Sequence, residues 1–170
     1  MSIRPDHFRQ YVVRPTLSRL AELSGQPNIN SEEAEELIMG TVAHESHLGH
    51  YLHQHPVGPA RGVGQMEEFT YYDLWESYLK HRTKLADAAR AFASIQSIEN
   101  GIPDFSDVIG NLAFAVVMIR VRYLPAPQAL PSADDLEAQA NYHIKYYNRG
   151  GAAEVHKYVN DYRRYVLGES

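Results

Sequence analysis

The chain has 170 residues, close to the usual size of one domain, and a formal net charge of −5 with a pI near 6.0. A chain of this length buries a core without help from disulfides or metals. Its acidic balance argues against a nucleic-acid partner, because tracking a phosphate backbone needs a clustered excess of Lys and Arg. The sequence has no cysteine, so disulfides and thiolate metal sites are excluded.

The N-terminal segment does not have the pattern of a secretory signal. Such a signal needs an unbroken apolar stretch, and here Asp6, His7, Arg9 and Gln10 interrupt it. The chain also lacks the run of about eighteen apolar residues that a membrane-spanning helix requires. The sequence therefore predicts no signal peptide and no membrane anchor, and we expect the protein to be made in the cytoplasm.

The first two predicted elements are helices. Within residues 7–23 apolar side chains recur close to one helical face, and Pro15 predicts a kink or break. The segment "GQPNIN" then stops this helix. Asn30, followed three residues later by Glu33, is typical of a capping box, and the apolar stripe that follows runs to Leu48. This pattern places Glu45 late on the second helix.

A loop rich in Gly and Pro, "HPVGPARGVG", follows, and a further helix is expected from about Thr70. Later helices are expected at residues 83–98, 106–123, 133–147 and 152–166. The turns "NGIPDFSD" and "LPAPQALPSADD" separate three of them, with Ser132 or Asp134 as a cap. We predict an all-α, or mainly α, single domain over residues 1–170, with residues 1–30 as an N-terminal helical extension packed on it.

The segment "TVAHESHLGHYLHQH" raises the question of a metal site. The triples His44–His47–His50 and His47–His50–His53 have the spacing of one helix face. The zinc-protease signature His-Glu-x-x-His nevertheless fails by one position, because Leu48 stands where the second histidine belongs. We interpret these histidines as half-exposed polar side chains, one or two of them lining a groove. The sequence therefore predicts no metal ligands and no cofactor.

Glu45 is the stronger candidate for a working residue. A carboxylic acid that acts as a general acid must stay protonated near neutral pH, which needs an enclosed setting and a pKa above the ordinary value of about 4.3. Apolar neighbours on the predicted helix provide such a setting, and the small Ala43 and Ser46 leave room for a ligand. The nearby "GPARGVGQM" supplies glycines for close backbone approach and the amide of Gln65.

Four motifs carry a resemblance to a known family. "Glu-Ser" at position 45, the loop "GPARGVGQM" and Thr70 resemble the first two motifs of the soluble lytic transglycosylases, within the lysozyme-like superfamily. That family reads Glu-Ser, then Gly-Ala-x-Gly-Leu-x-Gln, then Pro-x-Thr. The helix opened by Asn111 and ending "RVRYL" is similar to its Asn-Ile helix, and "YYNRGGAAEVHKYV" is similar to its Ala-Tyr-Asn-Ala-Gly segment. The four matches keep the family's order from Glu45 to about residue 159.

The resemblance implies a lysozyme-like domain with a substrate groove. It implies that Glu45 is the catalytic acid and base and that Tyr147 contacts or orients it. The substrate-binding residues that it implies are Ser46, Gly62, Gln65, Met66, Tyr147 and Asn148. Three departures, Gly64, Glu68 and Arg149, leave the shape of the groove floor and the choice of substrate open.

The reaction type depends on a second acid. Two-carboxylate glycosidases need one, and no acidic residue lies between Glu45 and Gln65, where goose-type lysozymes place aspartates. In peptidoglycan the N-acetyl group and the 6-hydroxyl of the same sugar can take the role of the missing second carboxylate. We therefore expect lytic transglycosylation at the MurNAc-GlcNAc β-1,4 bond, with a 1,6-anhydro product. One alternative is a hydrolytic muramidase in which Glu67 or Glu68 positions a water.

A second alternative is a non-catalytic module of the same fold that binds glycan or has a structural role in a virion. The expected partner in every case is the glycan strand of peptidoglycan. Two settings remain open, a phage lysis system that depends on a holin and a component of the virion. In both, the protein would act on the periplasmic or extracellular wall.

Overall fold

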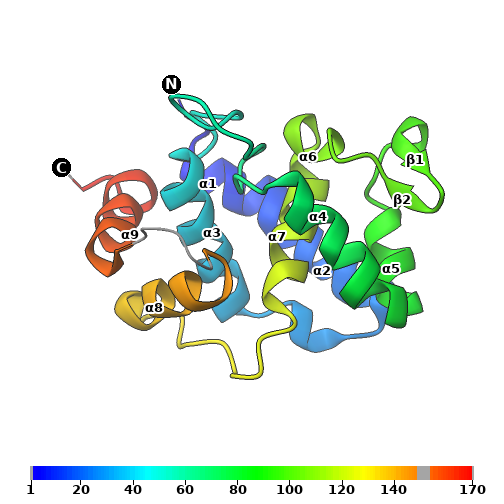
Figure 1. Cartoon of the computed structure of the whole chain (residues 1–170). Helices are drawn as coiled ribbons and strands as arrows, with labels where there is room; N and C mark the ends of the chain where they lie inside the picture. Colours follow the sequence, from blue (N-terminus) through cyan, green and yellow to red (C-terminus); the bar gives the residue numbers. More distant parts are fainter. Residues whose placement is uncertain (1, 149–153, 170) are drawn as a thin grey trace.

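The computed structural model describes residues 2–148 and 154–169, which are mainly helical, as the sequence predicted. Helix α1 (Pro5–Phe8), a π-helical turn (Arg9–Val13) and α2 (Arg14–Ser24) follow one another directly (Figure 1). Pro15 lies at the start of α2, just after the π-helical turn. Because proline has no N–H for the preceding turn, a change of helical type is expected at this point.

Helix α3 (Glu32–Ser46) carries Glu45, as predicted. Its N-cap is Ser31, whose Oγ accepts a hydrogen bond of 3.2 Å from the Ala34 N–H, so the prediction of Asn30 was wrong by one residue. Asn30 instead ends a short 3₁₀ turn, Pro27–Ile29. The prediction that the helical stripe reaches Leu48 was also wrong, because the chain leaves the helix through left-handed backbone at His47 (φ 52°) and Leu48 (φ 53°).

The middle of the chain holds short helices and one hairpin. Helix α4 (Glu68–Asp73), a π-helical turn (Leu74–Tyr78) and a 3₁₀ turn (Leu79–His81) lead to α5 (Thr83–Arg90). The helix expected over residues 83–98 ends at Arg90, and a 3₁₀ turn (Ile95–Ser97) precedes strands β1 (Ile98–Glu99) and β2 (Ile102–Pro103). Asn100 and Gly101 join these antiparallel strands with φ of 49° and 78°, as a type I′ turn requires.

The expected helix over residues 106–123 is two helices, α6 (Asp107–Gly110) and α7 (Leu112–Tyr123). Asn111 caps α7, because its Oδ1 accepts from the Phe114 N–H at 3.0 Å. Helix α8 (Leu136–Tyr146) is capped by Asp135 rather than by Ser132 or Asp134. Helix α9 (Val155–Tyr162) and a π-helical turn (Arg163–Leu167) end the described chain.

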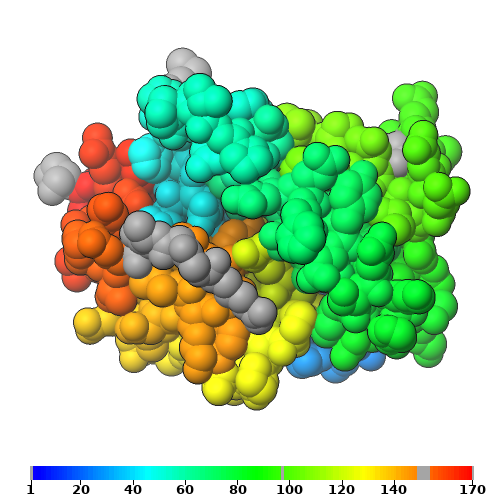
Figure 2. All heavy atoms as spheres, viewed as in Figure 1, coloured from blue at the N-terminus to red at the C-terminus, as the bar shows by residue number. Residues whose placement is uncertain are grey.

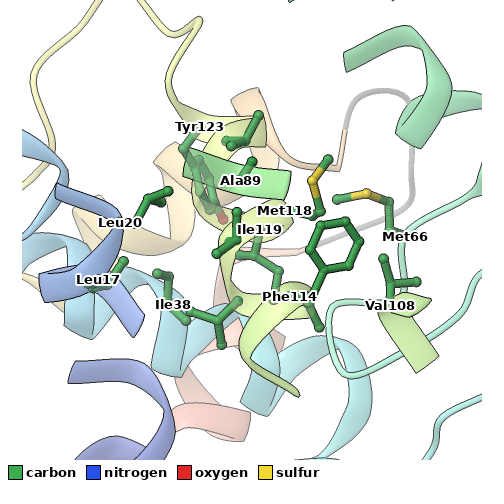
Figure 3. Packing of buried hydrophobic residues seen from close by; sticks show 14 of the residues in the cluster. Leu17, Leu20, Ile38, Met66, Ala89, Val108, Phe114, Met118, Ile119 and Tyr123 are labelled. Atoms are coloured by element: carbon green, nitrogen blue, oxygen red, sulfur yellow. The ribbon is translucent and has the colours of Figure 1, made fainter. Parts of the chain in front are cut away.

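The core surrounds α7, which lies in the middle of the molecule (Figure 1). Apart from Arg120 and Arg122 in its last turn, its residues are mainly apolar on every side, which is typical of a helix buried all round. Figure 3 shows its side chains packed among residues from α2, α3, α5, α6 and the loop before α4. The N-terminal segment contributes Phe8, Val13, Leu17 and Leu20, each fully buried in this same core.

One buried charge joins the N-terminal part of the chain to α7. Arg120 is 4% exposed, and its Nε donates to the carbonyl oxygen of Ile29 at 3.0 Å. Its Nη2 donates to the carbonyl oxygen of Asn28 at 3.2 Å. These bonds hold the turn before α3 against the central helix. In the described parts of the chain, no helix has both the length and the apolar character that crossing a membrane requires.

Candidate functional site

A polar pocket of about 570 Å³ opens where the end of α3, the segment 47–66 and the end of α8 meet. Figure 2 shows one face of the molecule, with segment 47–66 in cyan and teal above the orange α8 and α9. Four residues singled out by the sequence line this pocket together: Glu45, Gln65, Glu67 and Asn148. The remaining lining residues are His47, Tyr51, Gln54, His55 and Ala60.

Glu45 lies on the last turn of α3, and its side chain is 16% exposed. Its neighbour is His143 of α8, whose side chain is fully buried and whose Nε2 lies 3.1 Å from Glu45 Oε1. The two atoms are close, but they are not aligned for a hydrogen bond, so Nε2 lacks a hydrogen-bond partner among the described residues. Sequence reasoning missed His143, because nothing in its local pattern links it to α3.

A chain of hydroxyl groups fixes the other side of the His143 ring. Its Nδ1 lies 2.8 Å from the Tyr123 hydroxyl, which lies 2.7 Å from the Thr41 hydroxyl, and Thr41 donates to the carbonyl oxygen of Leu37. This order of donors places the imidazole proton on Nδ1 and leaves the Nε2 lone pair facing Glu45. Burial lowers the pKa of His143, which favours the neutral ring that this arrangement needs.

His47, His50 and His55 pack around the Tyr51 ring, with ring centroids 4.6–5.3 Å apart, and within residues 2–148 and 154–169 they do not form a group of metal ligands. His44 Nδ1 lies 2.8 Å from Asp161 Oδ2, while the His47 ring stacks on Tyr165 at 4.5 Å. Within residues 2–148 and 154–169, one group of three His and carboxylate side chains has ligand atoms within 4.8 Å of one another. It consists of His44, Glu45 and His143, and so differs from both histidine triples that the sequence suggested.

The loop over residues 58–66, called the glycine loop below, is a tight turn that presents Gln65 to the pocket. Arg61 and Met66 exchange two backbone hydrogen bonds of 2.9 Å. Gly62 has φ of 72°, and a Cβ there would lie 2.2 Å from the Val108 carbonyl oxygen, so this position needs glycine. Gln65 also has left-handed backbone, with φ of 44°, and its Nε2 donates to the carbonyl oxygen of Gly62 at 2.8 Å.

Tyr147 supports this loop rather than Glu45 directly. The sequence led us to expect contact with the glutamate, whereas the hydroxyl donates to the carbonyl oxygen of Gly64 at 2.6 Å. The side chain is buried, and burial raises the pKa of Tyr147, so the hydroxyl keeps its proton. Its ring also stacks on His143, the neighbour of Glu45, with ring centroids 5.2 Å apart.

Four other expected site residues lie outside the pocket lining. Ser46 is fully buried, where its Oγ donates to the Val42 carbonyl and accepts from the Gly49 N–H. Met66 is buried in the core, and the exposed Glu68 begins α4. Gly62 shapes the loop without lining the pocket. Two positions of the third motif, residues 149 and 150, lie outside the described residues.

The pocket combines carboxylate, imidazole and amide groups, which suits a ligand rich in hydroxyl and amide groups. Glu45 is the half-enclosed carboxyl group in it that can both donate and accept a proton. No protein-family model, no curated protein and no solved structure matches this chain. The function therefore has to be argued from this pocket and from the motifs that line it.

Proposed function

We propose that this protein is a lysozyme-like enzyme that degrades peptidoglycan, with Glu45 as its general acid and base. The main support is the meeting of Glu45, Gln65 and Asn148 around one polar pocket. They come from three separate segments of the chain, and each belongs to a motif that resembles the lytic transglycosylases.

The proposed reaction is lytic transglycosylation of the MurNAc-GlcNAc β-1,4 bond. Glu45 protonates the glycosidic oxygen as the bond from this oxygen to C1 of the muramoyl sugar breaks. The resulting carboxylate then takes the proton of the 6-hydroxyl while the oxygen of this hydroxyl forms a bond to C1, which gives the 1,6-anhydro product. Over the two steps the 6-hydroxyl loses one proton and the leaving sugar gains one, so one carboxyl group suffices and no water is consumed.

A hydrolytic muramidase is the second candidate, because Glu67 lines the same pocket as Glu45. Its position just before α4, exposed to solvent, would allow it to activate a water molecule. Glu68 does not share this position, since it is absent from the pocket lining. Of the two acids that the sequence suggested for this role, the geometry thus favours Glu67.

Digestion of purified cell-wall sacculi, followed by mass spectrometry of the released muropeptides, tests the proposal. Glu45→Gln keeps the shape of the side chain but cannot exchange the proton, so we expect digestion to slow by at least about 10²-fold. Glu76→Gln is the matched control, because Glu76 is exposed on a different helical turn. Retention of near-full activity by Glu45→Gln would remove Glu45 from the mechanism.

The products distinguish the remaining candidates. Anhydro muropeptides support the transglycosylase, whereas reducing ends that disappear in Glu67→Gln support the muramidase. Sedimentation with sacculi and no released product would instead identify a module that only binds glycan. The same sacculi assay, with protein added from outside, would also show whether the protein acts on the wall without other phage or virion components.

A further inference from the structure

We propose that His44, Glu45 and His143 bind one divalent transition-metal ion of the zinc class beside the pocket that Glu45 lines. Two imidazoles and one carboxylate are a donor set that zinc uses in catalytic sites, where a fourth position stays open. Here the pocket lies beside Glu45 and would provide that fourth position for a water or a ligand hydroxyl. The binding proposal itself does not depend on the proposed function.

The first support is the distance between Glu45 and His143 and the orientation of their facing atoms. Two donors held about 2.0–2.1 Å from one zinc ion in tetrahedral geometry lie roughly 3.3–3.4 Å apart. His143 Nε2 and Glu45 Oε1 are 3.1 Å apart, yet they are not aligned for a hydrogen bond with each other. A shared ion satisfies both atoms at nearly this separation, and it supplies the partner that the fully buried Nε2 lacks.

The second support is the set of groups behind the histidines. Metal-bound histidines almost always direct their other ring nitrogen at a carboxylate, carbonyl or water, which fixes the tautomer. His44 Nδ1 faces Asp161 at 2.8 Å, and His143 Nδ1 faces the Tyr123 hydroxyl at 2.8 Å. Both rings are thereby left with Nε2 as the metal donor.

The site needs only a small adjustment to close on an ion. Its three ligand atoms lie within 4.8 Å of one another, so the widest gap must shrink by at most about 1.4 Å to reach tetrahedral spacing. His44 can supply this movement, since its side chain is 13% exposed whereas His143 is fully buried. Asp161 is 24% exposed and can move with the His44 ring, so the site closes while the contact of 2.8 Å between His44 Nδ1 and Asp161 is kept.

Zinc binding is measured by isothermal titration of chelator-stripped protein with zinc chloride, with metal analysis after dialysis. We expect one zinc ion per chain and no comparable binding of Mg²⁺, which prefers oxygen ligands. His143→Asn retains an amide near Tyr123 but loses the Nε2 donor, and Glu45→Gln loses the carboxylate. Each should weaken binding by more than tenfold, and Asp161→Asn should weaken it by about 10–100-fold.

His47→Asn is the matched control, because it removes a pocket-lining histidine next to the site and asparagine tolerates its left-handed backbone. It should leave zinc affinity unchanged. Circular dichroism in chelator verifies the fold of each variant, and if His143→Asn fails to fold, Glu45→Gln carries the test. The proposal is overturned if wild-type protein binds less than one zinc ion, or if these ligand variants bind as well as wild type.

The effect on wall digestion keeps this test separate from that of the proposed function. If Glu45 is the general acid, an ion on its carboxylate blocks proton transfer, so zinc should inhibit digestion and chelator should restore it. Absence of digestion under all conditions would reject the enzyme and leave zinc binding to be decided by titration. If Glu45→Gln abolishes digestion while zinc-loaded wild-type protein digests at the full rate, the ion does not bind Glu45 and the site is overturned.

Discussion

The hydroxyl of Tyr147 donates a buried hydrogen bond of 2.6 Å to the carbonyl oxygen of Gly64. This bond joins the end of α8 to the glycine loop, so it fixes the position of Gln65, the next residue of that loop. The ring of Tyr147 also stacks on His143, the partner of Glu45. Tyr147 therefore contacts both the loop that carries Gln65 and the histidine that faces Glu45.

Tyr147→Phe keeps the ring but leaves the Gly64 carbonyl without its buried donor. We expect the free energy of unfolding to fall by about 1–3 kcal/mol, measured by urea denaturation. Sacculi digestion should also slow, because the loop is held less firmly. Tyr11→Phe, at a side chain that is 66% exposed, should change stability by less than about 0.5 kcal/mol. Equal effects of the two substitutions would show that the bond has no role.

Two glycines of the loop should differ in their tolerance of a methyl group. A Cβ at Gly62 would meet the Val108 carbonyl oxygen at 2.2 Å, with backbone at a φ of 72°. A Cβ at Gly64 would meet side-chain atoms of Ile119 and Tyr147 at 2.6 Å, and side chains can move. We expect Gly64→Ala to cost about 1–3 kcal/mol and Gly62→Ala to cost more, since it also strains the backbone.

Thermal unfolding of the two variants tests this order. Gly110→Ala is the control, because no atom lies within 4 Å of its Cβ position and its φ is not left-handed. It should melt at or slightly above the wild-type temperature, since alanine restricts the unfolded chain. A smaller loss for Gly62→Ala than for Gly64→Ala would contradict the loop geometry.

Glu35 should make stability depend on pH. It accepts hydrogen bonds from Arg9 at 2.7 Å and Arg14 at 2.8 Å, joining α3 to the N-terminal segment. Burial alone would raise the pKa of Glu35, but the two guanidinium groups outweigh it and lower the pKa. Because the folded pKa lies below the unfolded value of about 4.3, this stabilisation is present above that pH and is lost as the pH falls further.

Glu35→Gln should therefore lower the melting temperature at pH 7, with a difference from wild type that shrinks below about pH 4. Glu32→Gln is the matched control, since Glu32 is exposed on the same first turn of α3. It should have a small effect with little dependence on pH. A constant difference between Glu35→Gln and wild type across this range would contradict the assigned role of the two arginines.

Removal of metal should not lower wall digestion. The proposed acid and base is Glu45, and its proton transfer needs no ion. Dialysis against EDTA should therefore leave the rate of sacculi digestion at or above that of untreated protein, and added zinc should reduce it. A rate that falls with EDTA and returns with zinc would show that catalysis depends on metal and that Glu45 has a different role.

Local sequence patterns were reliable where neighbouring residues decide the structure. The helix that carries Glu45 follows from apolar spacing and a cap near residue 30, although Ser31 takes the cap because Asn30 closes the preceding turn. The resemblance placed Asn111 at the start of its helix, whereas the local pattern had predicted one helix over residues 106–123 with Asn111 inside it. The hairpin at Asn100 and Gly101 was missed, because the apolar residues before it extend a helical pattern that the local turn overrides.

The sequence by itself determined that Glu45 lies at the end of a helix, just before a loop that needs glycine. Only the tertiary structure decided that His143 faces Glu45 and that Tyr147 bonds to Gly64. Both pairs lie far apart along the chain. The first pair meets because α3 and α8 pack against each other, and the second because the end of α8 lies against the loop that contains Gly64. Helical periodicity specifies which face of a helix is buried, but it does not specify which side chain of another helix lies opposite.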